Sequence, residues 1–192
     1  MSSRYFSEKL PDHAIFSPSQ PSWLNYSDEQ IIERYCNMQA TERGTRLHEW
    51  AAETIALNIR QSRTKKTLNM FINDAIGFRM IPENDFTHPT RFVYSEFFFG
   101  TCDAYSYSNK ILRIHDLKTG KGPVHPEQLE IYAALFYLQE KLDPFENQTI
   151  LRIYQNDDVA EWEPEPDRIK DIMALIVRKD KLLREYLGGL YG

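Results

Sequence analysis

The sequence predicts an α/β fold with a mixed central β-sheet flanked by helices. Three observations lead to this prediction. Two runs rich in Tyr, Ile, Leu and Thr, at 101–107 and 111–117, flank a turn signal and predict an antiparallel hairpin. Segments with apolar residues at helical spacing lie before and after this hairpin. A further apolar run at 149–154 predicts another strand beside it.

Composition and charge narrow the class of protein. The chain has 192 residues and a formal net charge of −5, and its length and composition suit a single domain at 27–192. Residues 1–26 are polar and contain several prolines and serines, so we expect an N-terminal arm packed on the core. The acidic balance argues against a protein that coats nucleic acid through bulk electrostatics, but it suits an enzyme that gathers acids around metal ions. No long apolar run and no secretory signal stand out, so we expect a cytoplasmic protein with no membrane segment.

Helices are expected before the hairpin. Ser27 with Gln30 three residues later is a capping box, which opens a helix that ends near residue 38. A second helix is expected at 45–61. A third, at 65–80, is expected to end at Pro82.

The remaining elements are predicted from residues that end helices or strands, such as glycine and proline, and from the spacing of apolar residues. We expect a loop at 83–90, a strand at 91–99, a helix that starts at Pro126, and an acidic loop at 157–166. A last helix is expected at 167–187, stopped by Gly188-Gly189. Its inward residues are expected to be Ile169, Ile172, Met173, Ile176 and Leu183.

The register of the hairpin brings charged residues together. A turn at Asn109-Lys110 pairs Ser108 with Ile111, and counting back along both strands places Asp103 opposite Asp116. Lys118 shares the face of Asp116 at about 6.5–7 Å. Two carboxylates this close are costly without a cation, which favours a divalent metal. The alternative is a solvated Asp116–Lys118 ion pair on an edge strand, with Asp103 as a surface acid.

These residues resemble a known family. Asp103 in GTCDAY, Asp116 and Lys118 in DLKTGK, and Gln128 with Tyr132 in QLEIY are similar to the motifs of the PD-(D/E)XK nuclease superfamily, in its RecB-like or phage-type exonuclease branch. His48, in Gly44-Thr45-Arg46-Leu47-His48, fits the upstream histidine of that branch. The resemblance spans about residues 48–132. It departs in having Cys102 where the family has Pro before the first acid, and Asp rather than Glu as the second acid.

The resemblance implies a restriction-endonuclease-like core and a metal-dependent deoxyribonuclease. It implies that His48, Asp103, Asp116 and the carbonyl of Leu117 hold Mg²⁺ or Mn²⁺. Asp103, Asp116 and Lys118 are the implied catalytic residues. Gln128, Tyr132 and Lys121 are the implied nucleic-acid contacts.

Its implied setting is DNA recombination, repair or processing in a bacterium or phage, with DNA as substrate and a helicase, single-strand-binding protein or recombinase as a potential partner. Some relatives bind an iron–sulfur cluster through four cysteines. This chain has only Cys36 and Cys102, so we expect no such cluster.

Several alternatives stay open at this level. His48 could be a core histidine that forms a hydrogen bond to a neighbouring residue. Tyr132 could pack in the core while the side chain of Gln128 is exposed to solvent. The chain also suits a catalytically inactive nucleic-acid-binding or recombination-accessory protein, or an unrelated interaction domain with a surface charge cluster. Basic residues at 60–66, and a second set of Lys110, Arg113, Lys118 and Lys121, are candidate phosphate-binding patches.

Overall fold

The structure, a computed structural model of this chain, describes residues 16, 18, 21–83, 90–120 and 122–191. By its internal contacts the chain forms two compact units, Met1–Thr45 and Arg46–Gly192. The boundary between them falls inside helix α1 (Asp28–Ala56). Most of the arm expected at 1–26 lies outside the described residues, which there include a short 3-10 helix, η1 (Pro21–Asn25).

Helix α1 begins at the predicted capping box. The backbone N–H of Ser27 donates to Gln30 Oε1 at 2.9 Å, and the N–H of Gln30 donates to Ser27 Oγ at 3.3 Å. The prediction of two helices here was wrong, because α1 runs without a break from Asp28 to Ala56. Gly44 costs a helix only about 1 kcal/mol relative to Ala. The hydroxyls of Thr41 and Thr45 each donate to a carbonyl one turn earlier, so the segment keeps its hydrogen bonds within the helix.

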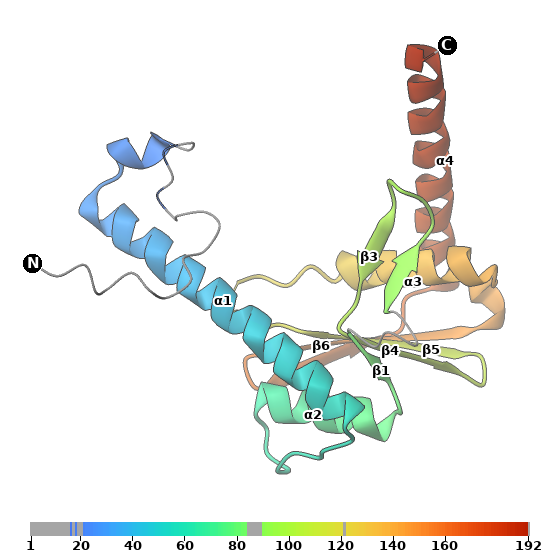
Figure 1. Cartoon of the computed structure of the whole chain (residues 1–192). Helices are drawn as coiled ribbons and strands as arrows, with labels where there is room; N and C mark the ends of the chain where they lie inside the picture. Colours follow the sequence, from blue (N-terminus) through green and yellow to red (C-terminus); the bar gives the residue numbers. More distant parts are fainter. Residues whose placement is uncertain (1–15, 17, 19–20, 84–89, 121, 192) are drawn as a thin grey trace, which may run out of the picture. The chain divides into compact units, whose positions relative to one another are not determined.

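The second unit is built on a mixed five-stranded sheet with the order β1-β4-β5-β6-β7 (Figure 1). The strands are Ile81–Pro82, Ala104–Ser108, Ile111–Leu117, Gln148–Gln155 and Asp158–Trp162. β5 and β6 are parallel, because helix α3 (Glu127–Glu140) connects them, and the other neighbours are antiparallel. The predicted mixed sheet flanked by helices is therefore confirmed.

The β4–β5 hairpin has the predicted register. Ser108 pairs with Ile111, and both turn residues have positive φ, 52° at Asn109 and 62° at Lys110. Two such residues make a turn whose twist matches the strands. The last pair of the ladder is Ala104 with His115, so Asp103 lies one residue beyond the paired region.

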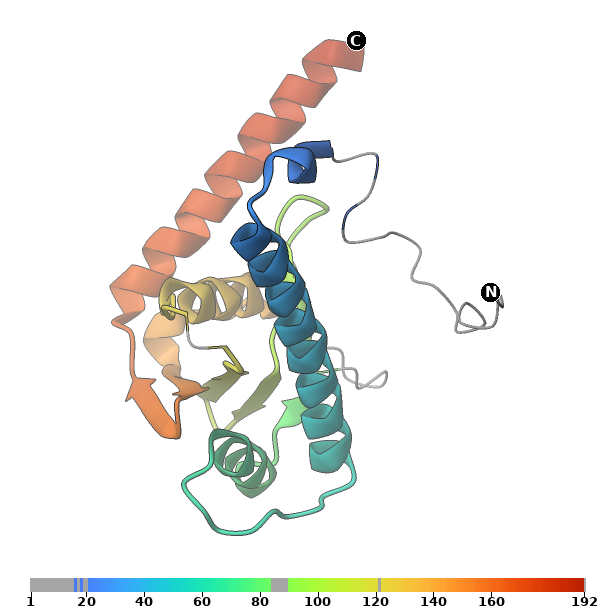
Figure 2. The same ribbon diagram turned by 90° about the vertical axis from the view of Figure 1, so that its left-hand side faces the viewer.

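Helices cover both faces of the sheet. Helix α2 (Thr67–Gly77) lies against one face, and α3 lies against the opposite face with α4 (Pro166–Tyr191) packed on it (Figures 1 and 2). The last turns of α1 join the α2 layer through Ala51 and Ile55. The α3 layer buries apolar residues of both central strands, namely Leu112, Ile114, Leu151 and Ile153. The sheet is thus the middle of three layers.

The strand expected at 91–99 was wrong. The chain reverses at 94–98 and forms a separate small sheet from β2 (Arg91–Val93) and β3 (Phe99–Thr101). Ser95 causes the reversal, since its hydroxyl accepts hydrogen bonds from the N–H groups of Phe97 and Phe98. The run of aromatic residues predicted a continuous strand, but the hydrogen bonds to the Ser95 hydroxyl stabilise a turn instead.

Two other boundaries differ from expectation, and a predicted loop lies mostly outside the described residues. α2 ends at Gly77, and Pro82 instead closes the edge strand β1, where its missing N–H is tolerated. Of the loop expected at 83–90, residues 84–89 lie outside the described residues. The predicted acidic loop at 157–166 contains the edge strand β7 (Asp158–Trp162), where charged side chains are common.

Helix α4 continues past Gly188-Gly189 to Tyr191. A glycine ends a helix when it adopts positive φ, and among the described glycines none does so. Ile169, Ile172 and Ile176 are buried as predicted, but Leu183 is 38% exposed. Among the described helices, none is both long enough and apolar enough to cross a membrane.

The core of the sheet should be sensitive to truncation. Ile114 on β5 is fully buried between the layers, whereas Ile131 on α3 is 43% exposed. We expect Ile114→Ala to lower the free energy of unfolding by about 2–5 kcal/mol, because it removes buried contacts and leaves a cavity. Ile131→Ala is the matched control and should change it much less. Urea denaturation followed by circular dichroism measures both, and equal effects would contradict the three-layer packing.

Candidate active site

The charged residues predicted from the sequence gather at one end of the sheet. Asp103 immediately precedes β4, and Asp116 and Lys118 lie at the end of β5. Because β4 and β5 are antiparallel, the start of one strand lies beside the end of the other. The hairpin register therefore brings the acids and the lysine to the same end of the sheet.

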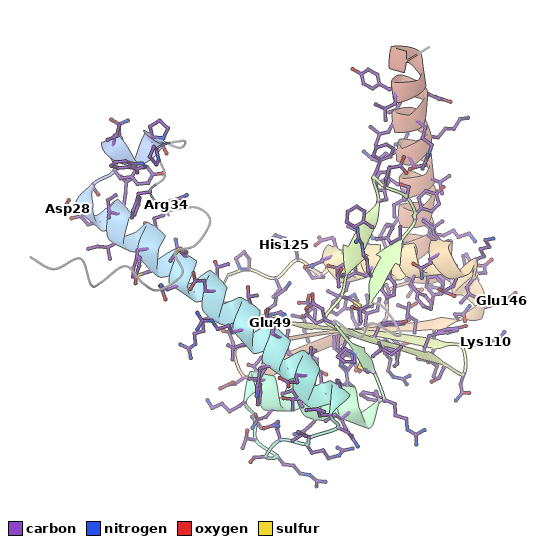
Figure 3. All side chains as sticks on the ribbon, in the orientation of Figure 1. Asp28, Arg34, Glu49, Lys110, His125 and Glu146 are labelled. Carbon is purple, nitrogen blue, oxygen red and sulfur yellow. The ribbon has the colours of Figure 1, made fainter. Side chains whose placement is uncertain are left out.

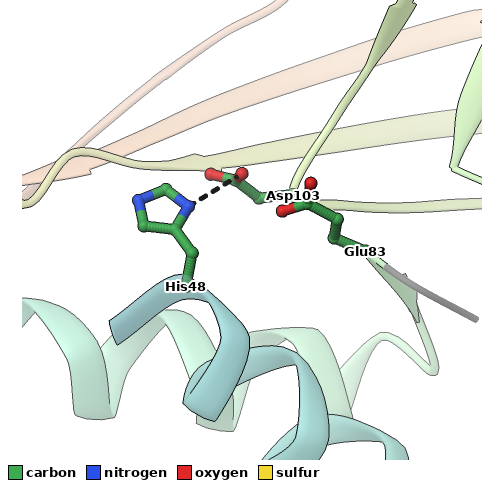
Figure 4. Close-up of side chains that lie close together, drawn as sticks. All are labelled: His48, Glu83 and Asp103. Carbon is green, nitrogen blue, oxygen red and sulfur yellow. Dashed lines mark hydrogen bonds and ion pairs between the residues drawn. The ribbon is translucent and has the colours of Figure 1, made fainter. Parts of the chain in front are cut away.

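The carboxylate of Asp103 connects helix α1 to this edge. Its Oδ1 lies 3.0 Å from His48 Nδ1 (Figure 4). Its Oδ2 accepts a hydrogen bond of 2.6 Å from the backbone N–H of Leu117. The imidazole of His48 is partly exposed, with a side-chain exposure of 26%. His48 therefore faces the acidic edge.

Glu83 completes a cluster that the sequence did not reveal. One ligand atom each from His48, Glu83 and Asp103 lies within 4.8 Å of the others, a group that could hold a metal ion (Figure 4). Glu83 reaches this place because it follows β1, which pairs with β4. Its backbone N–H also donates to the carbonyl of Asp103 at 2.8 Å. Little in the sequence indicated that a strand precedes Glu83, since β1 has only two residues and one of them is a proline.

Asp116 is the most buried of the acids, with only 6% of its side chain exposed. Lys118 Nζ lies 2.9 Å from Asp116 Oδ2 and 3.2 Å from Oδ1, but the angles allow a hydrogen bond only to Oδ1. Within the described part of the chain, the buried Oδ2 has no hydrogen-bond donor. The Lys118 ammonium, 2.9 Å away, is the cation that offsets the charge of this oxygen.

A chain of contacts holds the Lys118 ammonium from the α3 side. Lys118 Nζ donates to Gln128 Oε1 at 3.0 Å, and Gln128 Nε2 donates to the hydroxyl of Tyr132 at 3.1 Å. The ring of Tyr132 rests against Gly100 on β3, where an added Cβ would lie 2.6 Å from Tyr132 Cε1. A glycine is thus required at position 100 for this ring to fit.

The acids disturb one another electrostatically. Burial raises the pKa of Asp116, as does the charge of Asp103, while Lys118 opposes both effects. Burial also raises the pKa of Glu83, again with a contribution from Asp103. The hydrogen bond to Asp103 raises the pKa of His48. Burial and the charge of Asp103 thus disfavour the ionised forms of Asp116 and Glu83, and an added positive charge in this space would favour them.

The structure thus brings together most of the predicted site residues. His48, Asp103, Asp116 and Lys118 share the edge, and Gln128 and Tyr132 contact it from α3. Leu117, predicted as a carbonyl ligand, holds Asp103 through its N–H. Lys121 lies outside the described residues.

The basic residues predicted to form two phosphate-binding patches are partly dispersed and partly paired with acids. Lys110 and Lys118 lie at opposite ends of β5, and Lys110 pairs with Glu146 at 3.7 Å, so the second set does not form one patch. In the first set, Lys66 forms an ion pair with Asp157 at 2.7 Å. The lysines at these two positions are therefore held by acids of the chain itself.

Comparison with protein-family models, with curated proteins and with solved structures finds no match to this chain.

The fit of Tyr132 against Gly100 can be tested directly. Gly100→Ala should displace the ring and lower the free energy of unfolding by about 1–3 kcal/mol, as for other overpacked sites. In a Tyr132→Ala background the same change should cost much less, since the clashing ring is gone. Urea denaturation of the wild type, both single variants and the double variant gives this coupling. Additive effects would show that Gly100 and Tyr132 are not in contact.

Proposed function

We propose that this chain is a metal-dependent nuclease that hydrolyses phosphodiester bonds in DNA. The observation that carries the proposal is the set of three acids, a histidine and a lysine at one end of the sheet, with a nearly buried Asp116 paired to Lys118. The order of these residues along the chain also matches the motifs of the RecB-like branch. The mixed sheet, with the acids on its central hairpin, supports a restriction-endonuclease-like core.

Asp103 is shared by two sets of candidate ligands. On one side, His48 and Glu83 have atoms within 4.8 Å of it. The charge of Asp103 also acts on Asp116, and Asp103 Oδ2 accepts a hydrogen bond from the N–H of Leu117. In an extended strand the N–H and C=O of one residue point to the same neighbouring strand, and the N–H of Leu117 points to Asp103. The carbonyl of Leu117 is therefore expected on the same side.

The ligand chemistry suggests which ion binds. Carboxylate and carbonyl oxygens suit Mg²⁺ and Mn²⁺, and a histidine in the set shifts preference towards Mn²⁺. A divalent cation at this site would supply Lewis acidity and neutralise charge on the phosphate.

The protein's own residues have distinct roles in this proposal. Lys118 orients the attacking water and offsets negative charge that develops at phosphorus. Gln128 holds the ammonium of Lys118 in place, since its side-chain oxygen accepts a hydrogen bond from Nζ. Asp103 and Asp116 would hold the cation, and the proton of the attacking water would pass through solvent to the leaving oxygen as the P–O bond breaks.

The first test concerns the metal. His48→Ala and Glu83→Gln should each weaken Mn²⁺ binding at least tenfold without unfolding the chain, because each removes one ligand from a partly exposed cluster. The matched controls are His125→Ala and Glu146→Gln, which change exposed side chains of the same type (Figure 3). Calorimetric titration with Mn²⁺ measures affinity, and circular dichroism checks the fold.

Activity should follow the same metal. Incubation with end-labelled linear and circular DNA, single- and double-stranded, should give cleavage with Mg²⁺ or Mn²⁺ and none with EDTA. If His48→Ala loses its fold while metal affinity in the folded fraction is normal, His48 is a core residue rather than a ligand.

The second test separates chemistry from metal binding. Lys118→Ala should lower kcat by on the order of 10²-fold or more, because it removes a cation needed in the transition state. Mn²⁺ affinity should survive, since the ligands remain. Lys110→Ala is the matched control, because Lys110 is exposed in the hairpin turn at the other end of β5 (Figure 3). Cleavage by Lys118→Ala at the native rate under saturating metal would rule out the proposed nuclease mechanism.

A further inference from the structure

The loop between β5 and α3 returns to the site lysine at both of its ends. This glycine loop, residues 119–126, is described except for Lys121 and begins directly after Lys118. At its other end Gln128, in the first turn of α3, accepts a hydrogen bond of 3.0 Å from Lys118 Nζ. A residue that fixes the middle of this loop therefore also fixes the groups that lie beside the Lys118 ammonium.

Gln155, the last residue of β6, holds the middle of the glycine loop. Its side-chain Nε2 donates to the carbonyl of Gly120 at 2.8 Å and to the carbonyl of Gly122 at 2.9 Å. An amide nitrogen carries two protons, so it can form both hydrogen bonds at once. The carbonyl of Tyr154, one residue earlier, accepts from the backbone N–H of Lys118 at 2.9 Å. The end of β6 thus fixes both the lysine and the loop that follows it.

Neither of these two glycines is required by the chain itself. Among the described glycines none has positive φ, and a Cβ built at Gly120 or Gly122 would meet nothing within 4 Å. The two hydrogen bonds from Gln155 restrain the loop, so freedom of movement is not what these glycines provide. The remaining use of a glycine is the close approach of its backbone to another molecule.

The glycine loop offers hydrogen-bond donors to such a molecule. Gln155 satisfies two of its carbonyls, whereas the backbone N–H groups of Thr119, Gly120 and Gly122 have no acceptor among the described residues. Residues 119–126 contain no Asp or Glu, although the whole chain has a net charge of −5. Backbone N–H groups next to a lysine are typical contacts of a phosphate group.

We propose that the glycine loop binds a backbone phosphate of a nucleic-acid strand, and that Gln155 is the residue that positions the loop for it. The proposal deepens the proposed nuclease function and rests on it for the identity of the anion. Gln155 does not touch the strand, because both protons of its amide are used within the chain. Binding of a strand does not require cleavage, so it can be measured without metal.

The first experiment locates the phosphate. The amide resonances of Gly120 and Gly122 are followed by NMR while an eight-thymidine DNA strand is added to the full chain in EDTA, and both should shift to saturation. The same strand with methylphosphonate links is the matched ligand, because it keeps the bases and lacks the anionic oxygens. It should leave both resonances in place. Resonances that the natural strand does not move, or equal shifts with both strands, would overturn the phosphate site.

The second experiment tests Gln155 as a positioning residue. Gln155→Met keeps the length of the side chain without a donor, and it should weaken binding of the strand about tenfold, the effect of one lost hydrogen bond to a charged group. With Mn²⁺ it should raise KM about tenfold, change kcat less than about threefold and leave Mn²⁺ affinity unchanged. Gln148→Met is the matched control, because Gln148 begins β6 and donates to Glu163 instead. Native binding by Gln155→Met would reject this role.

Two further substitutions at the same position separate donation from bulk. Gln155→Lys places an ammonium that can donate to both carbonyls, whereas Gln155→Glu places an acceptor against them. The order of the loop is measured by the ¹H–¹⁵N NOE of Gly120 and Gly122 without DNA, so attraction or repulsion of the strand does not enter. Gln155→Lys should keep the native order and Gln155→Glu should lose it. Equal order in the two variants would show that donation by residue 155 does not hold the loop.

A glycine variant leaves Gln155 in place. Gly122→Ala should fold and keep the order of the loop, since the added Cβ meets nothing in the chain, yet it should weaken strand binding at least about threefold by keeping the phosphate away. Gly77→Ala is the matched control, because Gly77 in α2 has an equally open Cβ position and no positive φ. Equal affinity of the two variants for the strand would contradict close approach at the loop.

Failure of the loop and failure of the nuclease give different results. Phosphate-dependent shifts of Gly120 and Gly122 without any DNA cleavage would uphold the loop and reject the nuclease. Cleavage with a KM that Gln155→Met does not change would uphold the nuclease and reject the loop.

Discussion

The carboxylate of Asp103 is the contact on which the site depends. One of its oxygens meets His48 of α1, and the other accepts from the N–H of Leu117 at the end of β5. It thereby joins a helix on one face of the sheet to the strand that carries Asp116 and Lys118. The same carboxylate raises the pKa of Asp116 and of Glu83. A single side chain therefore assembles the site and adds to the burial that disfavours the ionised forms of Asp116 and Glu83.

The hairpin and its charged residues could be predicted from the sequence because the information is local. Asn109 and Lys110 adopt the positive φ that a two-residue turn requires, and the turn sets every pair along the two strands. The period of two then assigns Asp116 and Lys118 to one face. Asp103 follows from the same count, although it lies one residue beyond the ladder.

The remaining parts depend on contacts between distant segments. Glu83 joins the site only because a two-residue edge strand that includes Pro82 pairs with β4. A proline in so short a segment predicts a break, so the sequence offered no reason to place this acid. The reversal at Ser95 was missed because the aromatic residues around it predicted a continuous strand, whereas one hydroxyl turns the chain. The strand β7 was missed because its segment is acidic and its alternation of apolar and polar residues is weak. The continuous α1 shows the opposite error, since the segment expected to separate two helices is itself helical.

The position of Gln128 changes how its role is understood. Sequence alone suggested a contact to substrate, but both ends of its amide are bonded within the chain, the oxygen to Lys118 and the nitrogen to Tyr132. Lys118 consequently lies between two acceptors, Asp116 on its own strand and Gln128 on α3. A long flexible ammonium held in this way loses its conformational freedom during folding rather than during the reaction. Gly100 belongs to the same chain of contacts, because only a residue without Cβ lets Tyr132 pack close enough to hold Gln128.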